Sequence, residues 1–142
     1  MNNLTNHLSR AFRGAFPQQL RIVYANSTAL HLRFWCIPAH QTLSGSAEIV
    51  EIRPQSPLST FIPNVRGHYT QLSLKERRML LHLSGTFSPH LSPAPSNPQE
   101  FKALMSLDSD WNGKGSFCWG EHYIEDAVVN PVDETDDLIF GH

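Results

Sequence analysis

The sequence predicts an α+β fold, in which a small antiparallel sheet packs against about three helices. Residues 19–53 alternate apolar and polar side chains in three short runs, which is typical of a three-stranded meander. Two later stretches, 72–85 and 97–107, combine helix-capping residues with apolar residues at helical spacing. Residues 116–124 are expected to add a late strand. At 142 residues the chain has the size of one domain, and we assign residues 1–142 to it.

The first predicted element is an amphipathic helix that ends between residues 14 and 17. Its apolar residues recur at every fourth position, at Leu4, Leu8, Phe12 and Phe16. Two strands follow on either side of a turn at Asn26–Ser27, and a third spans residues 46–53. Alternation in the second strand gives it an apolar face and a basic, aromatic face. The apolar face holds Leu30, Leu32, Phe34 and Cys36, and the other face holds His31, Arg33 and Trp35.

Two further helices are predicted in the second half of the chain. In residues 72–85, Ser73 is a suitable N-cap, Glu76 completes a capping box and Gly85 is a natural terminator. The buried side of this helix is expected to hold Leu72, Leu74, Met79, Leu80 and Leu83. A proline-rich loop at 86–98 leads to a helix over 97–107, in which Pro98 occupies the first helical position. A turn cluster at 108–115, the late strand and an acidic C-terminal segment at 121–142 complete the chain.

The net charge of −2 conceals a strong polarity along the chain. Residues 1–98 contain nine Lys or Arg and three Glu, whereas residues 99–142 contain two Lys and ten Asp or Glu. Such asymmetry is typical of a protein in which one end meets an oppositely charged partner. The alternative is that the two halves neutralise each other within one fold.

Each of the two cysteines is followed four positions later by a histidine, which gives the pairs Cys36–His40 and Cys118–His122. Zinc prefers four sulfur and nitrogen ligands in a tetrahedron, and two such pairs could supply them. The alternative is that both cysteines are small apolar residues of the core, where free cysteines usually lie. No cofactor other than zinc is suggested.

The acidic segment at 121–142 suggests the leading functional hypothesis. We expect a small, soluble, non-enzymatic protein, an adaptor or inhibitor, that binds a protein with a basic surface, such as part of a nucleic-acid-processing complex. Aromatic residues among the carboxylates would serve as anchors, which a purely solvating tail lacks. The residues assigned to this site are Glu121, Tyr123, Glu125, Asp126, Asp133, Glu134, Asp136, Asp137 and Phe140.

The alternative hypothesis is a nucleic-acid-binding module, since arginines and aromatic residues are interspersed through the basic half. Its candidate residues are Arg10, Arg13, Arg33, Arg77 and Arg78. Residues 72–85 are also similar to the first helix of LuxR-type helix-turn-helix domains. The proline-rich residues after them cannot form a recognition helix, so this likeness implies no function.

A third hypothesis is an enzyme that uses Cys118 as nucleophile and His122 as base. No lipase-type Gly-x-Ser-x-Gly, phosphate-binding glycine loop or His-Glu-x-x-His motif accompanies these residues. The sequence therefore leans against catalysis. The low cysteine content and the lack of a long apolar run indicate a cytoplasmic protein without a membrane partner.

Overall fold

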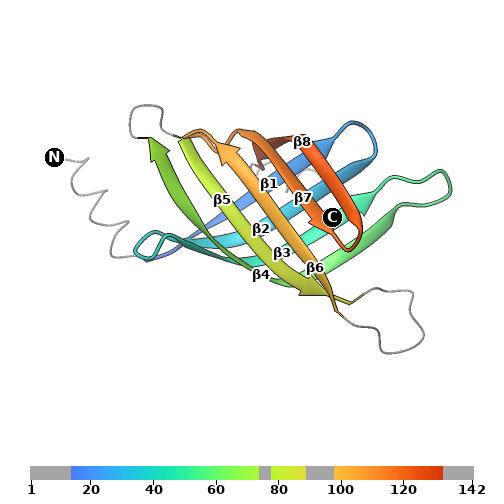
Figure 1. Cartoon of the computed structure of the whole chain (residues 1–142), viewed down its shortest axis with the longest axis horizontal. Coiled ribbons are helices and arrows are strands. Elements are labelled where there is room, and N and C mark those ends of the chain that lie inside the picture. The colour runs from blue at the N-terminus through green and yellow to red at the C-terminus, as the bar shows by residue number, and fades with distance from the viewer. Residues whose placement is uncertain (1–13, 74–77, 89–97, 133–142) are drawn as a thin grey trace.

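A computed structural model describes residues 14–73, 78–88 and 98–132. These residues form an all-β, closed barrel of eight antiparallel strands, each paired with the next along the chain (Figure 1). The predicted α+β fold is therefore wrong, because no helix occurs in these ranges. The strands are β1 (Phe16–Tyr24), β2 (Thr28–Ile37), β3 (Thr42–Glu51), β4 (Leu58–Ser73), β5 (Arg78–Phe87), β6 (Gln99–Leu107), β7 (Gly113–Trp119) and β8 (His122–Pro131).

The barrel closes where β1 pairs with β8. This seam consists of four residue pairs, from Leu20–Pro131 to Val23–Val128, whereas the other neighbouring strands share six to ten pairs. Over these four pairs the terminal strands are joined to each other, and the sheet has no open edge there. The seam is the shortest of the eight strand pairings.

The three-stranded meander is confirmed, as β1, β2 and β3, with the first turn between Tyr24 and Thr28. The alternation predicted for the second strand is also confirmed. Its four apolar residues point into the barrel, and Arg33 and Trp35 are exposed on the outside.

The helix predicted over 72–85 is wrong in the part that the structure describes. Met79, Leu81 and Leu83 of β5 point inward at a spacing of two, while Leu80 and His82 between them lie on the outer face. The predicted helical face had grouped Leu80 with Met79 and Leu83, and a strand separates them because its side chains alternate.

The helix predicted over 97–107 is also wrong, because Phe101, Ala103, Met105 and Leu107 alternate inward along β6. The first predicted helix lies mostly outside the described residues, but Phe16, its last apolar residue, begins β1. The predicted loop at 86–98 begins later than expected, since Phe87 still belongs to β5.

The single late strand predicted over residues 116–124 is instead part of a hairpin, in which Gly120 and Glu121 join β7 to β8. The first part of the acidic segment is therefore a barrel strand.

Large apolar side chains fill the inside of the barrel, as expected for eight strands, whose interior is about wide enough for its own side chains. Phe101 and Phe117 are among the fully buried ones. At the end where β1 begins, the half-buried Trp111 packs edge-on against Phe16 and tilts against Phe34, with ring centroids 6.4 Å and 6.2 Å apart. This aromatic cluster covers the core at that end.

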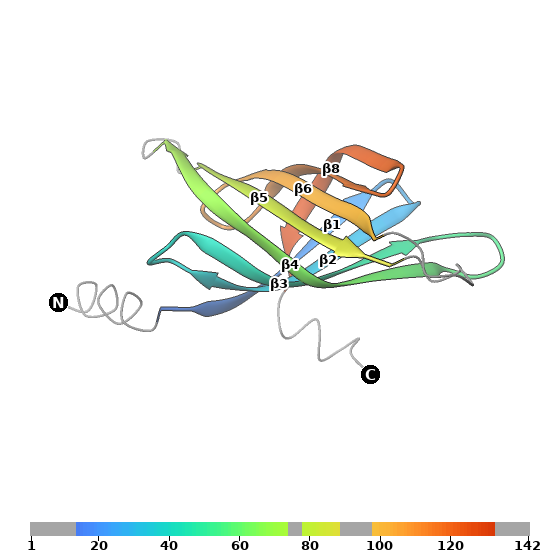
Figure 2. The same ribbon diagram turned by 60° about the horizontal axis from the view of Figure 1, so that its bottom comes forward.

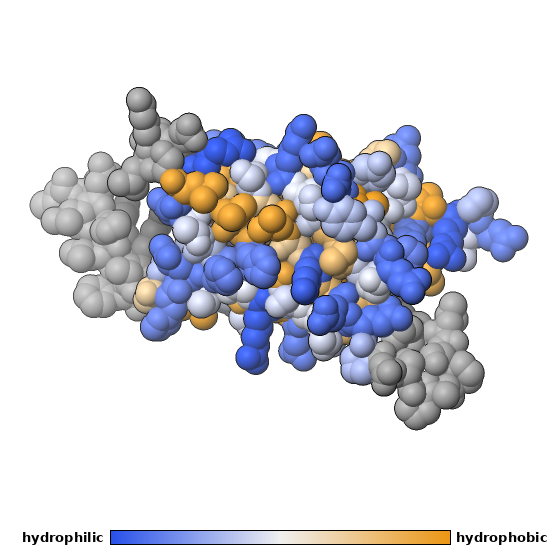
Figure 3. All heavy atoms as spheres, viewed as in Figure 1, coloured by the Kyte–Doolittle hydropathy of each residue, from blue (hydrophilic) through white to orange (hydrophobic). Residues whose placement is uncertain are grey.

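The exterior is mostly hydrophilic, with an apolar area on the face viewed in Figure 3. Exposed apolar side chains include Leu72 of β4 and Leu104 of β6. The hairpin of β3 and β4 extends beyond the neighbouring strands at one end (Figure 2). Within the described ranges, no helix is long and apolar enough to span a membrane.

Candidate functional site

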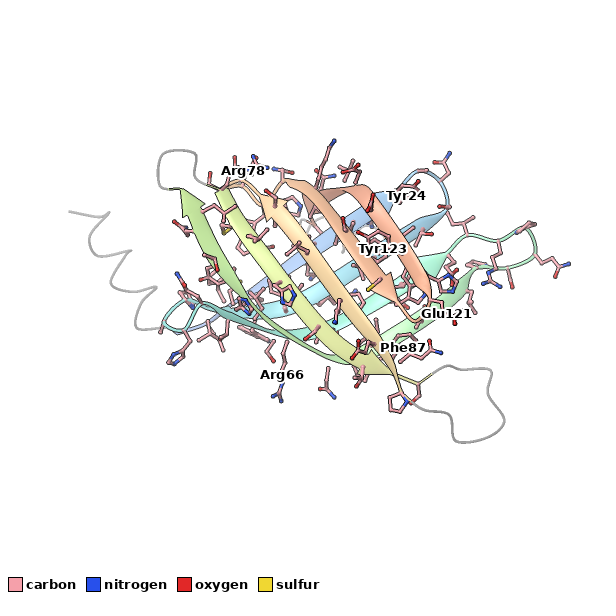
Figure 4. The ribbon with its side chains drawn as sticks, viewed as in Figure 1. Tyr24, Arg66, Arg78, Phe87, Glu121 and Tyr123 are labelled. Atoms are coloured by element: carbon pink, nitrogen blue, oxygen red, sulfur yellow. The ribbon has the colours of Figure 1, made fainter. Side chains whose placement is uncertain are left out.

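The hairpin β7–β8 carries the described part of the predicted acidic site. Its turn needs a glycine, because Gly120 has φ of +59°, and a glycine at the first of two turn residues is typical of a type II′ hairpin. Glu121 occupies the second position, at the exposed tip of the hairpin (Figure 4). The sequence Gly-x between two runs with strand character was a hairpin signal that the sequence analysis missed.

A β-bulge next to this turn brings two carboxylates to the surface. The register shifts between Gly115 and Phe117 of β7, so that Ser116 faces both Glu125 and Asp126 of β8. Asp126 has φ of +57°, a left-handed conformation that aspartate adopts more readily than most residues. Because the bulge breaks the alternation of β8, both carboxylates are exposed side by side.

Tyr123 lies on the same outer surface, paired across the hairpin with Cys118, and its side chain is 60% exposed (Figure 4). Its hydroxyl is hydrogen-bonded to the Glu125 carboxylate, and this bond is the main cause that raises the pKa of Tyr123. The ring is thus held among the carboxylates and open to a partner. Glu121, Tyr123, Glu125 and Asp126 therefore share one hairpin. The remaining predicted members, Asp133, Glu134, Asp136, Asp137 and Phe140, lie outside the described residues.

The structure does not bring the two Cys-x-x-x-His pairs together. Cys36 points into the barrel from β2, whereas Cys118 lies on the outer face of β7, with β1 and β8 between the two strands. His40 is in the turn after β2 and His122 begins β8, at the opposite end of the barrel. None of the described residues form a group of three or more potential metal ligands. The four residues therefore do not make a tetrahedral site.

Cys118 and His122 do not form a nucleophile–base pair either. Cys118 shares its outer face with Tyr123, while His122 pairs with the inward-facing Trp119 and stacks on its ring, with centroids 4.7 Å apart. Thiol and imidazole thus point to opposite sides of the hairpin. A general base must reach the proton that it removes, and this arrangement prevents it.

Of the arginines of the alternative hypothesis, the two that the structure describes lie on different strands. Arg33 is exposed on the outer face of β2. Arg78 begins β5 and donates a hydrogen bond from Nε to Ser106 Oγ at 3.3 Å. Arg10, Arg13 and Arg77 lie outside the described residues.

A second surface feature, missed by the sequence analysis, is a hollow of about 260 Å³ on the outer face of β2, β3 and β4. It lies beside a bulge at which Ser46 of β3 faces both Pro63 and Asn64 of β4. A proline fits there, because a bulge spares it from donating a ladder hydrogen bond. The hollow is lined by His31, Arg33, Ser46, Ala47, Glu48 and Phe61. The sequence gives no sign of it, since the pairing of β3 with β4 has to be known first.

Fold and surface together define a small closed β-barrel with an apolar core and with its charged side chains on the exterior. The family described as Domain of unknown function (DUF1842) matches residues 13–123, and the chain belongs to this family. No curated protein matches the chain.

Proposed function

We propose that this chain is a non-enzymatic macromolecule-binding protein, an adaptor or inhibitor, and that the acidic hairpin β7–β8 binds a basic surface on another protein. The observation that supports it is the exposed ring of Tyr123 among Glu121, Glu125 and Asp126. Tyrosine is a frequent hot spot in protein interfaces, and surrounding charges speed association with a partner of opposite charge.

The apolar lining of the interior favours a role for the outer surface, because the charged side chains of the described residues lie outside the core. We place this activity in the cytoplasm, because both cysteines are free thiols, as is usual for proteins of a reducing compartment. A nucleic-acid-processing complex is a suitable setting, since its proteins present basic surfaces.

The first prediction tests the hairpin with a photo-crosslinking residue at position 123. We expect it to capture a basic protein in nuclease-treated lysate, whereas the same residue at Leu72, which is exposed on β4 away from the hairpin, should not. Once the captured protein is purified, its binding can be measured directly. Tyr123→Ala should raise the dissociation rate and weaken the binding free energy by about 1–3 kcal/mol. Replacing Glu121, Glu125 and Asp126 by their amides should instead slow association and weaken its salt dependence.

Leu72→Ala is the matched control, and thermal unfolding of each variant shows whether the barrel is intact. Equal capture at positions 72 and 123, or unchanged kinetics in the Tyr123 variant, would show that the hairpin is not the binding surface.

A further inference from the structure

The hollow beside the β3–β4 bulge combines an aromatic wall with a cationic one. Phe61 of β4 is 52% exposed, although phenylalanine is usually buried. Arg33 lines the hollow from β2, on the other side of β3. A planar group that entered between these two side chains would meet a ring face and a guanidinium plane, both of which stack on nucleobases.

A carboxylate that can accept hydrogen bonds from a ligand also lines the hollow. Glu48 pairs across the sheet with His31 on one side and Phe61 on the other. Ser59 donates a hydrogen bond of 2.6 Å to Glu48 Oε2, which holds the carboxylate in place. A carboxylate accepts hydrogen bonds from the exocyclic amine of a base such as cytosine, and it has no donor for the carbonyl of uracil or thymine at that position.

Two further arginines lie on the same outer surface as the hollow. Arg21 of β1 donates a hydrogen bond from Nε to His31 Nε2 at 3.1 Å, which brings its guanidinium to the edge of the hollow. Arg66 extends outward from β4 (Figure 4) and pairs across the sheet with Ser44 of β3. Arg33 and Arg21 therefore supply cations at the hollow, and Arg66 adds a third cation further along the same outer face, which suits a polyanion.

A second exposed aromatic residue continues the surface along β2. Trp35 is two residues beyond Arg33 on the same outer face, and its side chain is 54% exposed. It pairs across the sheet with Ser44, whose other partner is Arg66. Aromatic and cationic groups therefore alternate along the face, which is how proteins bind successive nucleotides of a single strand.

We propose that the outer face of β2–β4 binds single-stranded nucleic acid, with one base in the hollow against Phe61, the next on Trp35, and phosphates on Arg33, Arg66 and Arg21. Glu48 makes the hollow prefer bases that carry an exocyclic amine. The centre of this face, β3, lies across the barrel from β7 of the hairpin, since three strands separate β3 from β7 in either direction. The inference does not depend on the proposed function of the hairpin.

The test measures fluorescence anisotropy of short labelled homopolymers of cytidine and thymidine at low salt. We expect the cytidine strand to bind more tightly, and Glu48→Gln to reduce the difference. Phe61→Ala and Trp35→Ala should each weaken binding by roughly five- to a hundred-fold. Three phosphate contacts predict a slope of log Kobs against log salt of about −2, and Arg33→Ala or Arg66→Ala should each reduce it by roughly 0.7.

Lys102→Ala and Leu104→Ala are matched controls, because both side chains are exposed on β6, away from this face. Circular dichroism checks that each variant folds. No binding by the wild type, or equal loss in the β6 controls, would overturn the proposal. If cytidine monophosphate bound as tightly as the cytidine homopolymer, Trp35 and Arg66 would have no part in binding. That result would overturn the proposal that the face binds a nucleic-acid strand.

A protein occupant is the competing outcome. Sedimentation at low salt would reveal self-association, and its loss in Phe61→Ala would show that the hollow takes the acidic hairpin of a second copy. That result would also overturn the proposal.

Discussion

At the scale of single residues, the two cysteines show how far identical local patterns can diverge. Cys36 and Cys118 each precede a histidine by four positions, yet one faces the core and the other faces outward. The direction of each follows from its place in the alternation of its strand, and the spacing to the histidine has no part in it. Alternation around Cys36 was visible in the sequence, whereas the hairpin that orients Cys118 was not recognised.

The second prediction concerns thiol reactivity. Burial raises the pKa of Cys36 to about 12, so its thiol stays protonated as well as inaccessible. A maleimide reagent should therefore modify Cys118 in the folded protein and Cys36 only after unfolding, as mass spectrometry of peptides can show. Cys118→Ser provides the control, and rapid labelling of this variant under native conditions would contradict the burial of Cys36.

The third prediction follows from the same pKa. Between pH 9.0, the ordinary pKa of a thiol, and about 12, the unfolded chain loses the Cys36 proton and the folded chain keeps it. The free energy of unfolding should therefore fall as the pH rises above 9.0, by up to about 1.4 kcal/mol per pH unit. Burial also raises the pKa of Tyr69, with a smaller contribution from Cys36, and adds to the loss in the same direction. Urea titrations below and above pH 9.0 measure this loss of unfolding free energy. If the Cys36→Ala variant lost stability with pH at the same rate, the loss would come from another group.

At the scale of elements, strands were predicted well where turn residues separated short alternating runs, as in β1–β3. They were missed where a capping pattern preceded a run such as Phe101-Lys102-Ala103-Leu104-Met105, which fits a period of two as well as a helix. Tertiary pairing decided between these readings, because β5 and β6 each find partners on both sides in the ring. Of the acidic site, the residue types could be predicted, but the bulge that exposes Glu125 beside Asp126 could not.

The fourth prediction tests the close approach of two strands. Gly67 of β4 pairs with Leu83 of β5, and an added Cβ would overlap with the carbonyl oxygen of His82. Because the obstacle is backbone, a strand has to move, so Gly67→Ala should lower the free energy of unfolding by about 1–3 kcal/mol in urea. Ser84→Ala, at an exposed position of β5, is the control. Equal stability of the two variants would mean that the strands lie further apart than described.

At the scale of the whole molecule, the ring depends on contacts between the first and the last strand, β1 and β8. No local pattern marks Leu20 and Pro131 as neighbours, so closure of the barrel could not be predicted from the sequence. Such distant pairing also makes folding slow, because the chain has to close a long loop before the seam can form.

The fifth prediction is that the seam is the least protected part of the barrel. It has four residue pairs against ten between β2 and β3, so local opening there breaks fewer interactions. In hydrogen exchange followed by mass spectrometry, amides of residues 128–131 should exchange faster than those of residues 30–36. Equal protection of both segments would indicate that the ring opens only as a unit.

The seam has a further consequence for how the chain encodes this shape. In a closed barrel every strand has two neighbours, whichever strand the chain begins with. The fold therefore does not require the chain to begin at β1 and end at β8. A circularly permuted chain, joined through a linker from Val132 to Gly14 and cut in the exposed loop at 53–57, would contain the same ladder pairs in a different order. We expect the permuted chain to form the same ring and to keep the hollow and the hairpin β7–β8 at the same places on it.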